Sequence, residues 1–205
     1  MDRGGRAMRQ KKKEKETVSE SKGKKAGRML TPMEALIFDL GSNDDVVRVK
    51  ARHALVAFGK AAVPSLIEAL KSEHYLMRWE AAKALGEIGD PDAASALVKA
   101  LEDNEFDVRW LAAEGLVKMN INGLKPLLQA LEHRGDSALL REGAHHVFHD
   151  LAKGRLRKFL ASVLAALEAL EPGEDVPWAS SHEMEVEVPW AARRALEILE
   201  KEKKP

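Results

Sequence analysis

Apolar residues recur along this chain at the spacing of one face of a helix. Counted from Arg48, they stand three, seven and ten positions later, at Ala51, Leu55 and Phe58. Positions three or four residues apart lie on the same side of a helix that has 3.6 residues per turn. The pattern therefore predicts an amphipathic helix that buries this face.

The same pattern returns after three further arginines. Arg48, Arg78, Arg109 and Arg141 are 30, 31 and 32 residues apart, so the chain contains an internal repeat. We call these four residues the anchor arginines. The third position after each is an alanine and the seventh is a leucine or phenylalanine: Ala51 and Leu55, Ala81 and Leu85, Ala112 and Leu116, Ala144 and Phe148. A period of this length is typical of stacked helical hairpins.

Each repeat is predicted to be a hairpin of two helices, A and B. Gly59 and Gly89 stand eleven residues after their anchor arginines and predict the C-terminal ends of A helices. Asp90 and Pro91 then predict the cap and first residue of the following B helix. We expect the other glycines to close helices as well. The chain is therefore predicted to be all-α, an α-solenoid or superhelix.

The phase of the repeat predicts the layout of the chain. A disordered basic tail spans 1–30, and the repeat domain spans 31–204. Within the domain we predict a lone B helix (B0, 31–40), repeats 1 to 4 (44–71, 74–102, 105–132 and 137–171), an insertion (172–187) and a final A helix (A5, 188–204). Half-repeats at both ends would cover the terminal faces of the stack. The B helices are expected to line the surface that binds partners.

The charged residues are distributed unevenly along the chain, although its net charge is zero. Residues 1–28 contain eleven Lys and Arg residues against four Asp and Glu residues, with few apolar side chains. Such a segment is expected to be disordered. It could neutralise nucleic-acid phosphates, although interleaved glutamates and the lack of aromatic residues favour a solubilising extension. The longest apolar run, 159–167, is too short to span a bilayer, so we expect no membrane contact and a cytoplasmic location.

A resemblance to known proteins is carried by residues 86–101, which read Gly-Glu-Ile-Gly-Asp-Pro-Asp-Ala-Ala-Ser-Ala-Leu-Val-Lys-Ala-Leu. This stretch resembles the HEAT-like repeats of phycobilisome-lyase-type proteins. The resemblance covers roughly residues 32–200 and implies an α-solenoid of about four to five HEAT-like hairpins, or roughly ten helices. Because such repeats mostly serve as scaffolds, it implies a non-enzymatic scaffold or adaptor with a protein partner and no cofactor.

Two groups of enzymes resemble the same repeats and remain alternatives. In deoxyhypusine hydroxylase, His-Glu pairs at the first and second positions after the anchor arginine hold a di-iron site. Here Glu80 is the one residue that keeps this pattern, and no histidine does, which argues against iron. A phycobilin lyase has no motif apart from the repeat itself. The lack of cysteine or another clue to a chromophore disfavours that alternative.

Candidate metal ligands occur in repeat 4. His145 and His149 are four residues apart and would share one helix face, with Asp150 adjacent. A third ligand would have to come from His182 or Glu183. Since two ligands do not complete a site, a solvated helix flank is the favoured interpretation. The sequence shows no nucleophile–base pair and no glycine-rich phosphate loop, so it predicts no catalytic or cofactor-binding residue, no metal and no enzyme.

Three tryptophans share one place in the repeat. Trp79 and Trp110 directly follow anchor arginines, and Trp190 holds the same place in A5. This place lies about 120–160° from the buried face of the helix, on its flank. Each indole could wedge between neighbouring A helices or form a ledge for a partner. We predict a buried wedge at Trp110 and partial exposure at Trp190. The candidate partner-binding residues are Trp79, Trp190 and His149.

Overall fold

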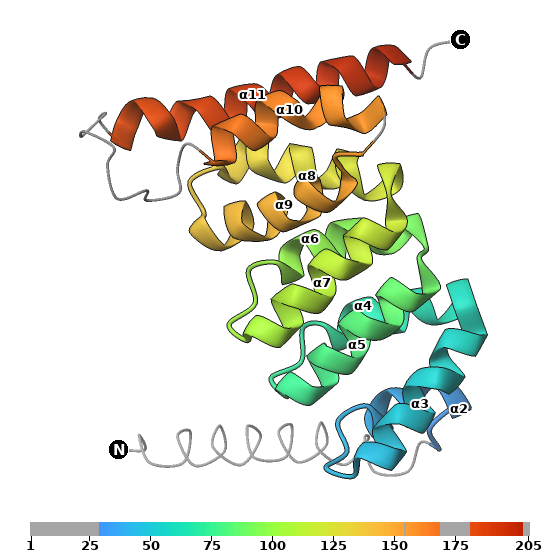
Figure 1. The fold of residues 1–205 in the computed structure, drawn as a ribbon. Coiled ribbons are helices and arrows are strands. Elements are labelled where there is room, and N and C mark those ends of the chain that lie inside the picture. The colour runs from blue at the N-terminus through green and yellow to red at the C-terminus, as the bar shows by residue number, and fades with distance from the viewer. Residues whose placement is uncertain (1–28, 154, 169–180, 203–205) are drawn as a thin grey trace, which may run out of the picture. The chain divides into compact units, whose positions relative to one another are not determined.

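The computed structural model describes residues 29–153, 155–168 and 181–202. All regular elements in these ranges are helical (Figure 1), so the predicted all-α class is confirmed. The α-helices are α2 (Pro32–Asp39), α3 (Asp45–Phe58), α4 (Val63–Ala69), α5 (Tyr75–Ile88), α6 (Ala94–Ala100), α7 (Phe106–Met119), α8 (Ile121–Arg134), α9 (Ala138–Leu151), α10 (Arg155–Glu168) and α11 (Ser181–Glu202). Short 3-10 turns, Gly59–Ala62 and Pro91–Ala93, precede α4 and α6.

From Met33 onward the helices stack in two layers. One layer contains the A helices α3, α5, α7 and α9, each packed on the next. The other contains the B helices, where α6 packs on α8, while α4 and α6 also pack on α5 and α7 of the first layer. The residues at the seventh position after each anchor arginine are fully buried: Leu55, Leu85, Leu116 and Phe148. Stacked hairpins of this kind form an α-solenoid, as predicted.

Most of the predicted tail lies outside the described residues, and so does the nucleic-acid contact suggested for residues 1–28. The chain divides at Pro32, and Met33–Pro205 form one compact unit. The first described helix, α2, begins at Pro32 and ends at Asp39. The boundaries proposed for the tail and the repeats remain predictions.

Two glycines end A helices in the way that the sequence predicts. Gly59 follows α3 with a φ angle of 57°, and Gly89 follows α5 with a φ angle of 68°. A positive φ is costly for a residue with a Cβ atom, which is why glycine suits these helix ends. Asp90 then accepts a hydrogen bond from the backbone N–H of Asp92 and caps the next turn.

The anchor arginines bind the loops between repeats. In each of them, Nη1 donates to the carbonyl oxygen six residues earlier, in the loop that follows a B helix. The four bonds run from Arg48 to Ser42 (2.8 Å), from Arg78 to Ser72 (2.9 Å), from Arg109 to Asp103 (2.9 Å) and from Arg141 to Gly135 (2.9 Å). A charged donor makes a stronger hydrogen bond than a neutral one. Each arginine therefore fixes the loop that leads into its own helix, which accounts for its recurrence at the repeat period.

Further polar contacts join successive loops along this edge of the stack. Arg78 forms a two-bond ion pair with Asp103, with N–O distances of 2.7 and 2.9 Å. These hydrogen bonds raise the pKa of Arg78 above its usual value. Glu102, beside Asp103, accepts hydrogen bonds from Arg134 and from Oγ of Ser137. The loops before α5, α7 and α9 are therefore linked in series.

The expectation that the remaining glycines close helices is wrong at Gly86 and Gly115, which lie inside α5 and α7. A Cβ atom on Gly86 would lie 2.9 Å from Cα of Gly115, and one on Gly115 would lie 3.2 Å from Cα of Gly86. The backbones of α5 and α7 therefore meet where no side chain fits between them. Gly143, inside α9, is confined in a similar way by the side chain of Leu101.

We expect Gly86→Val to lower the free energy of unfolding by about 1–3 kcal/mol, because the new side chain forces α5 and α7 apart. Urea unfolding followed by circular dichroism measures the change. Lys118→Val is the matched control, since Lys118 is exposed on α7 and the substitution places the same β-branched residue in a helix. Equal losses of stability in the two variants would contradict the close backbone contact.

The last described helix differs from the predicted A5. It begins at Ser181 rather than at residue 188, so residues 181–187 of the predicted insertion are helical. Residues 172–180 of that insertion lie outside the described part of the chain. Helix α11 also packs mainly on α8 and α10, where a regular A helix would continue the layer beside α9.

Helix α11 lies on α8 in the antiparallel sense. Two ion pairs join them: Lys125 with Glu200 at 3.0 Å, and Glu132 with Arg193 at 3.7 Å. At the C-terminal end of α8, a Cβ atom on Gly135 would lie 2.9 Å from Cδ of Pro189, so the missing side chain lets α11 pass close by. The apolar period shows which face of a helix is buried but not which neighbour buries it. Helix α11, which has the apolar pattern of an A helix, therefore packs on α8 of the B layer and not beside α9 in the A layer.

Candidate functional site

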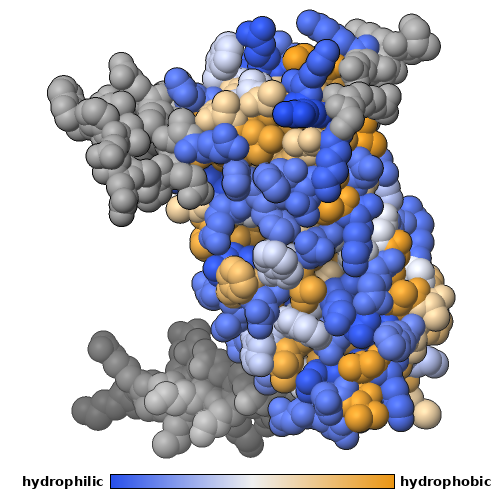
Figure 2. Space-filling view, viewed as in Figure 1, coloured by the Kyte–Doolittle hydropathy of each residue, from blue (hydrophilic) through white to orange (hydrophobic). Residues whose placement is uncertain are grey.

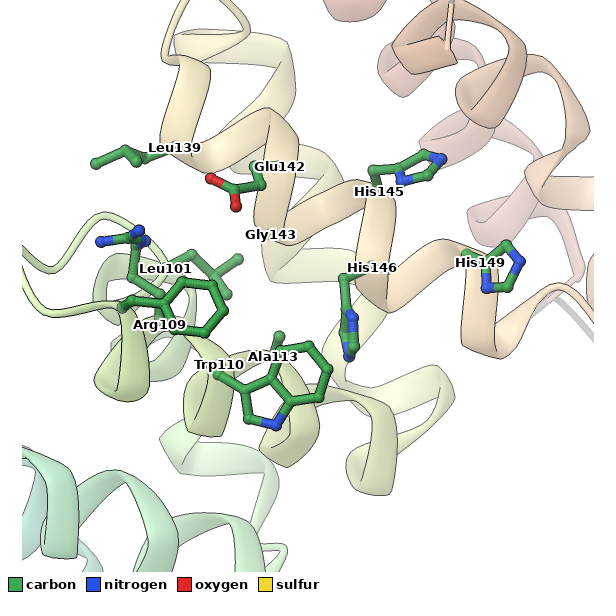
Figure 3. A pocket seen from close by; sticks show the side chains of 11 residues that line it. Leu101, Arg109, Trp110, Ala113, Leu139, Glu142, Gly143, His145, His146 and His149 are labelled. Carbon is green, nitrogen blue, oxygen red and sulfur yellow. The ribbon is translucent and has the colours of Figure 1, made fainter. Parts of the chain in front are cut away.

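A groove of about 450 Å³ lies between α7 and α9 (Figure 3). One wall comes from α7 and the other from α9, with Leu101 from the end of α6 also in the lining. The side chains that give the groove its character are Phe106, Arg109 and Trp110 on α7, and Glu142, His145, His146 and His149 on α9. The groove thus combines an aromatic wall with a wall that carries three histidines.

The aromatic wall consists of Phe106 and Trp110, one turn apart on α7. These residues are 55% and 47% exposed, and their ring centroids are 6.2 Å apart. The guanidinium of Arg109 lies 5.5 Å from the centre of the Phe106 ring, which is an attractive cation–π arrangement. The predicted buried wedge at Trp110 is therefore wrong, because the flank between α7 and α9 stays open as the groove.

His146 is the histidine that faces the aromatic wall. In Figure 3 it points toward Trp110, whereas the side chains of His145 and His149 project away from Trp110, at the edge of the groove. The His146 and Trp110 ring centroids are 4.4 Å apart, with an edge-on angle of 60°. Nε2 of His146 also lies 3.1 Å from Oε1 of Glu114 on α7. His146 therefore connects the two helices beneath the groove.

The predicted metal ligands His145 and His149 lie on successive turns, with ring centroids 6.2 Å apart. Nε2 of His145 is 3.9 Å from Oε1 of Glu168, and Nδ1 of His149 is 3.4 Å from Oδ1 of Asp150. The side chains of residues 182 and 183, suggested as third ligands, lie outside the described part. A metal site at this pair remains a prediction.

Glu114 and His146 are site residues that the sequence reasoning missed. The structure brings them together with Asp150, and one ligand atom of each lies within 4.8 Å of the others. A usable signal was present, because Glu114 and His146 both stand five positions after their anchor arginines. Equivalent positions on packed A helices lie side by side, so the repeat register itself predicts this contact.

The predicted partner-binding residues lie on three different helices and line no common groove among the described residues. Trp79 on α5 is partly buried, and Nζ of Lys83 lies 4.8 Å from its ring centre. Trp190 on α11 is 59% exposed, which confirms its predicted partial exposure, and Arg194 lies 5.3 Å from its ring centre. His149 lines the groove between α7 and α9. The role of these residues in binding remains a prediction.

Glu80, the residue that matches the hydroxylase pattern, makes a buried ion pair. It is 1% exposed, and its Oε2 accepts a hydrogen bond from Nε of Arg52 at 2.9 Å. Arg52 is 5% exposed and also contacts Glu87 at 2.5 Å. Glu80 on α5 is therefore engaged in holding α3 to α5.

The B layer has a hollow of its own. It measures about 470 Å³ and lies between α4 and α6, with Ile67 and Leu70 beside Lys99 and Asp103. The lining of this hollow contains no aromatic side chain. Partner binding by the B helices therefore remains a prediction, and the aromatic groove lies in the other layer.

Residues 33–117 match the family model for HEAT repeats. This segment consists of HEAT repeats. The matched segment runs from α2 through most of α7, and it contains three of the four anchor arginines. The repeat character predicted from the sequence is confirmed.

Solved structures that are similar to this HEAT-repeat protein include the following two. One is the complex of CpcE and CpcF of phycocyanin lyase from Nostoc sp. PCC7120, with 25% identity, coverage of 86% of this chain and 67% of that chain, and a TM-score of 0.45. The other is an engineered protein, with 20% identity, coverage of 82% of this chain and 79% of that chain, and a TM-score of 0.41. Comparison with curated protein sequences gives no match.

The visible face of this HEAT-repeat protein is mainly hydrophilic, and its apolar residues form separate patches (Figure 2). None of the described helices combines the length and apolar character needed to cross a membrane. Exposed aromatic residues include Phe38, Phe58 and Tyr75 as well as Phe106 and Trp110. The last two share one groove, which singles it out as the candidate binding site.

Proposed function

We propose that this HEAT-repeat protein is a non-enzymatic scaffold that binds a protein partner in the groove between α7 and α9. The observation that carries the proposal is the half-exposed aromatic wall of Phe106 and Trp110 beside a cavity of about 450 Å³. Tryptophan is frequent among the residues that dominate the binding energy of protein interfaces. A groove between two helices suits a short amphipathic segment of a partner.

The chemistry of the lining supports binding rather than catalysis. Arg109 is already engaged, since its Nη1 donates to the carbonyl oxygens of Asp103 and Asn104. His146 is in contact with Glu114. The described lining contains no hydroxyl or amine that could serve as a nucleophile. The partner segment that fits best is therefore mainly apolar, with an anchor side chain that packs against Trp110.

Trp110→Ala should weaken partner binding by about 2 kcal/mol, or roughly thirtyfold. The same substitution should change the free energy of unfolding by less than about 1 kcal/mol, because the indole is half exposed. A partner isolated with the full chain by affinity purification is titrated against both forms. Urea unfolding of both forms gives the change in stability.

Phe38→Ala is the matched control for this experiment. Phe38 is 73% exposed on α2 and does not line the groove, so its removal should leave the affinity unchanged. Undiminished binding by Trp110→Ala would overturn the groove as the binding site. A stability loss of about 3–5 kcal/mol would restore the wedge interpretation. An absorbing chromophore on the purified chain would instead support the lyase-type alternative.

A further inference from the structure

A cluster of metal-ligand side chains lies beside the groove, on the side formed by His146. Glu114 of α7 and His146 and Asp150 of α9 each present one ligand atom, and these atoms lie within 4.8 Å of one another. His146 and Asp150 are four residues apart and share one face of α9. The three side chains are 36%, 25% and 40% exposed, respectively, so an ion from solution has access to them.

We propose that Glu114, His146 and Asp150 bind a divalent transition-metal ion such as Zn²⁺ or Co²⁺. These ions accept carboxylate oxygens together with an imidazole nitrogen, whereas Ca²⁺ and Mg²⁺ prefer oxygen ligands. Metal–ligand distances of about 2.0–2.2 Å place the ligand atoms of a tetrahedral site roughly 3.3 Å apart. Nε2 of His146 and Oε1 of Glu114 are already 3.1 Å apart. The ligand atom of Asp150 lies within 4.8 Å of both, so it has to approach them by about 1.5 Å at most for all three to share one ion.

The charges around the cluster favour a bound cation. Among the described residues, the ion partners of Glu114 and Asp150 are the imidazoles of His146 and His149, respectively. An imidazole is charged only when it is protonated, and no lysine or arginine of the described part pairs with either carboxylate. Two partly buried carboxylates side by side repel each other unless a cation compensates them. A divalent ion supplies that compensation.

Neighbouring side chains hold the ligands in position. The Trp110 ring stands edge-on to His146 at a centroid distance of 4.4 Å, which restricts rotation of the imidazole. Nδ1 of His149 lies 3.4 Å from Oδ1 of Asp150, and contacts of this kind orient the carboxylate ligands of metal sites. Three protein ligands leave one position of a tetrahedral ion for water. The proposal does not depend on partner binding in the groove.

The test is isothermal titration calorimetry of the full chain, freed of metal with a chelator and then titrated with Zn²⁺. We expect one ion per chain, and an affinity at least about tenfold lower in His146→Asn and in Glu114→Gln. His145→Asn is the matched control, one position away on the same helix, and should leave the affinity unchanged. The visible absorption of Co²⁺ reports its coordination, and circular dichroism shows that each variant remains folded.

Three outcomes would overturn the proposal. The first is the absence of Zn²⁺ binding by the unaltered chain, and the second is unaltered affinity in His146→Asn. The third is a loss of binding in His145→Asn but not in His146→Asn, which would assign the ion to the His145 and His149 pair. Trp110→Ala leaves all three proposed ligands in place, so this variant tests partner binding without removing the metal site. A negative result for partner binding and a negative result for Zn²⁺ binding are therefore distinguishable.

Discussion

Glu80→Ala should lower the free energy of unfolding by about 3 kcal/mol. The substitution removes the carboxylate that now lies 2.9 Å from the guanidinium of Arg52, which is 5% exposed and keeps the partly exposed Glu87 as its other partner. Arg48, whose Nε is 3.5 Å from the other carboxylate oxygen, loses the same counter-charge. A buried charge that loses its buried partner is costly because the protein interior does not replace its hydration, and Glu87 compensates Arg52 only in part. Urea unfolding followed by circular dichroism measures the loss.

Two comparisons make this result specific. Glu68→Ala removes an ion pair with Lys71 in which the side chains are 74% and 66% exposed, and exposed pairs contribute at most about 1 kcal/mol. The double variant Arg52→Met with Glu80→Met should recover most of the loss, since it leaves neither of the two charges buried. Equal effects of Glu80→Ala and Glu68→Ala would show that burial adds nothing to the importance of the pair.

Ala112→Asp should also destabilise the stack by several kcal/mol. Ala112 is 0% exposed on α7, and α5 and α9 pack against the two flanks of this helix. A carboxylate at this position loses its hydration without gaining an ion pair or hydrogen bonds in return. Ala161→Asp is the matched control, because Ala161 is exposed on α10 and its substitution should change stability by about 0.5 kcal/mol or less.

The damage from Ala112→Asp should remain local. Because each repeat contacts its neighbours and not the distant repeats, a stack of this kind unfolds in parts. Amide hydrogen exchange should therefore accelerate most in α5, α7 and α9 and least in α2 and α11. Unchanged thermal unfolding would show that the repeat register is wrong, and a uniform acceleration would show that the stack unfolds as one unit.

The features that could be predicted from the sequence are those with local causes. The period of the anchor arginines and the apolar residues at fixed offsets define each A helix, because a helix face is set by residues within a few turns. Gly59 and Gly89 end helices through their own backbone conformation, so their roles are visible in the sequence. Asp90 caps a turn only two residues away for the same reason.

The features that could not be predicted depend on which helices become neighbours. Gly86 and Gly115 resemble any other helix-closing glycine until α5 and α7 are placed together. Trp110 occupies the predicted flank, but its exposure depends on how closely α9 approaches α7. The placement of α11 on α8 follows from a long-range contact that no period encodes. The contact between Glu114 and His146 is an exception, because both residues stand five positions after an anchor arginine and the repeat register therefore predicts it.

The linked loops along one edge of the stack have a mechanical consequence. Arg78 holds its own loop through Ser72 and the next loop through Asp103, while Glu102 holds the third loop through Ser137. Stretching this edge therefore strains charged contacts in series, so a displacement of one loop is transmitted to the next. The side chains of Arg78 and Asp103 are only 13% and 10% exposed, and dissolved ions screen such pairs far less than exposed ones, so the stiffness of this edge should change little as ionic strength rises. The solenoid therefore resists stretching along this edge to a similar degree at low and at high salt.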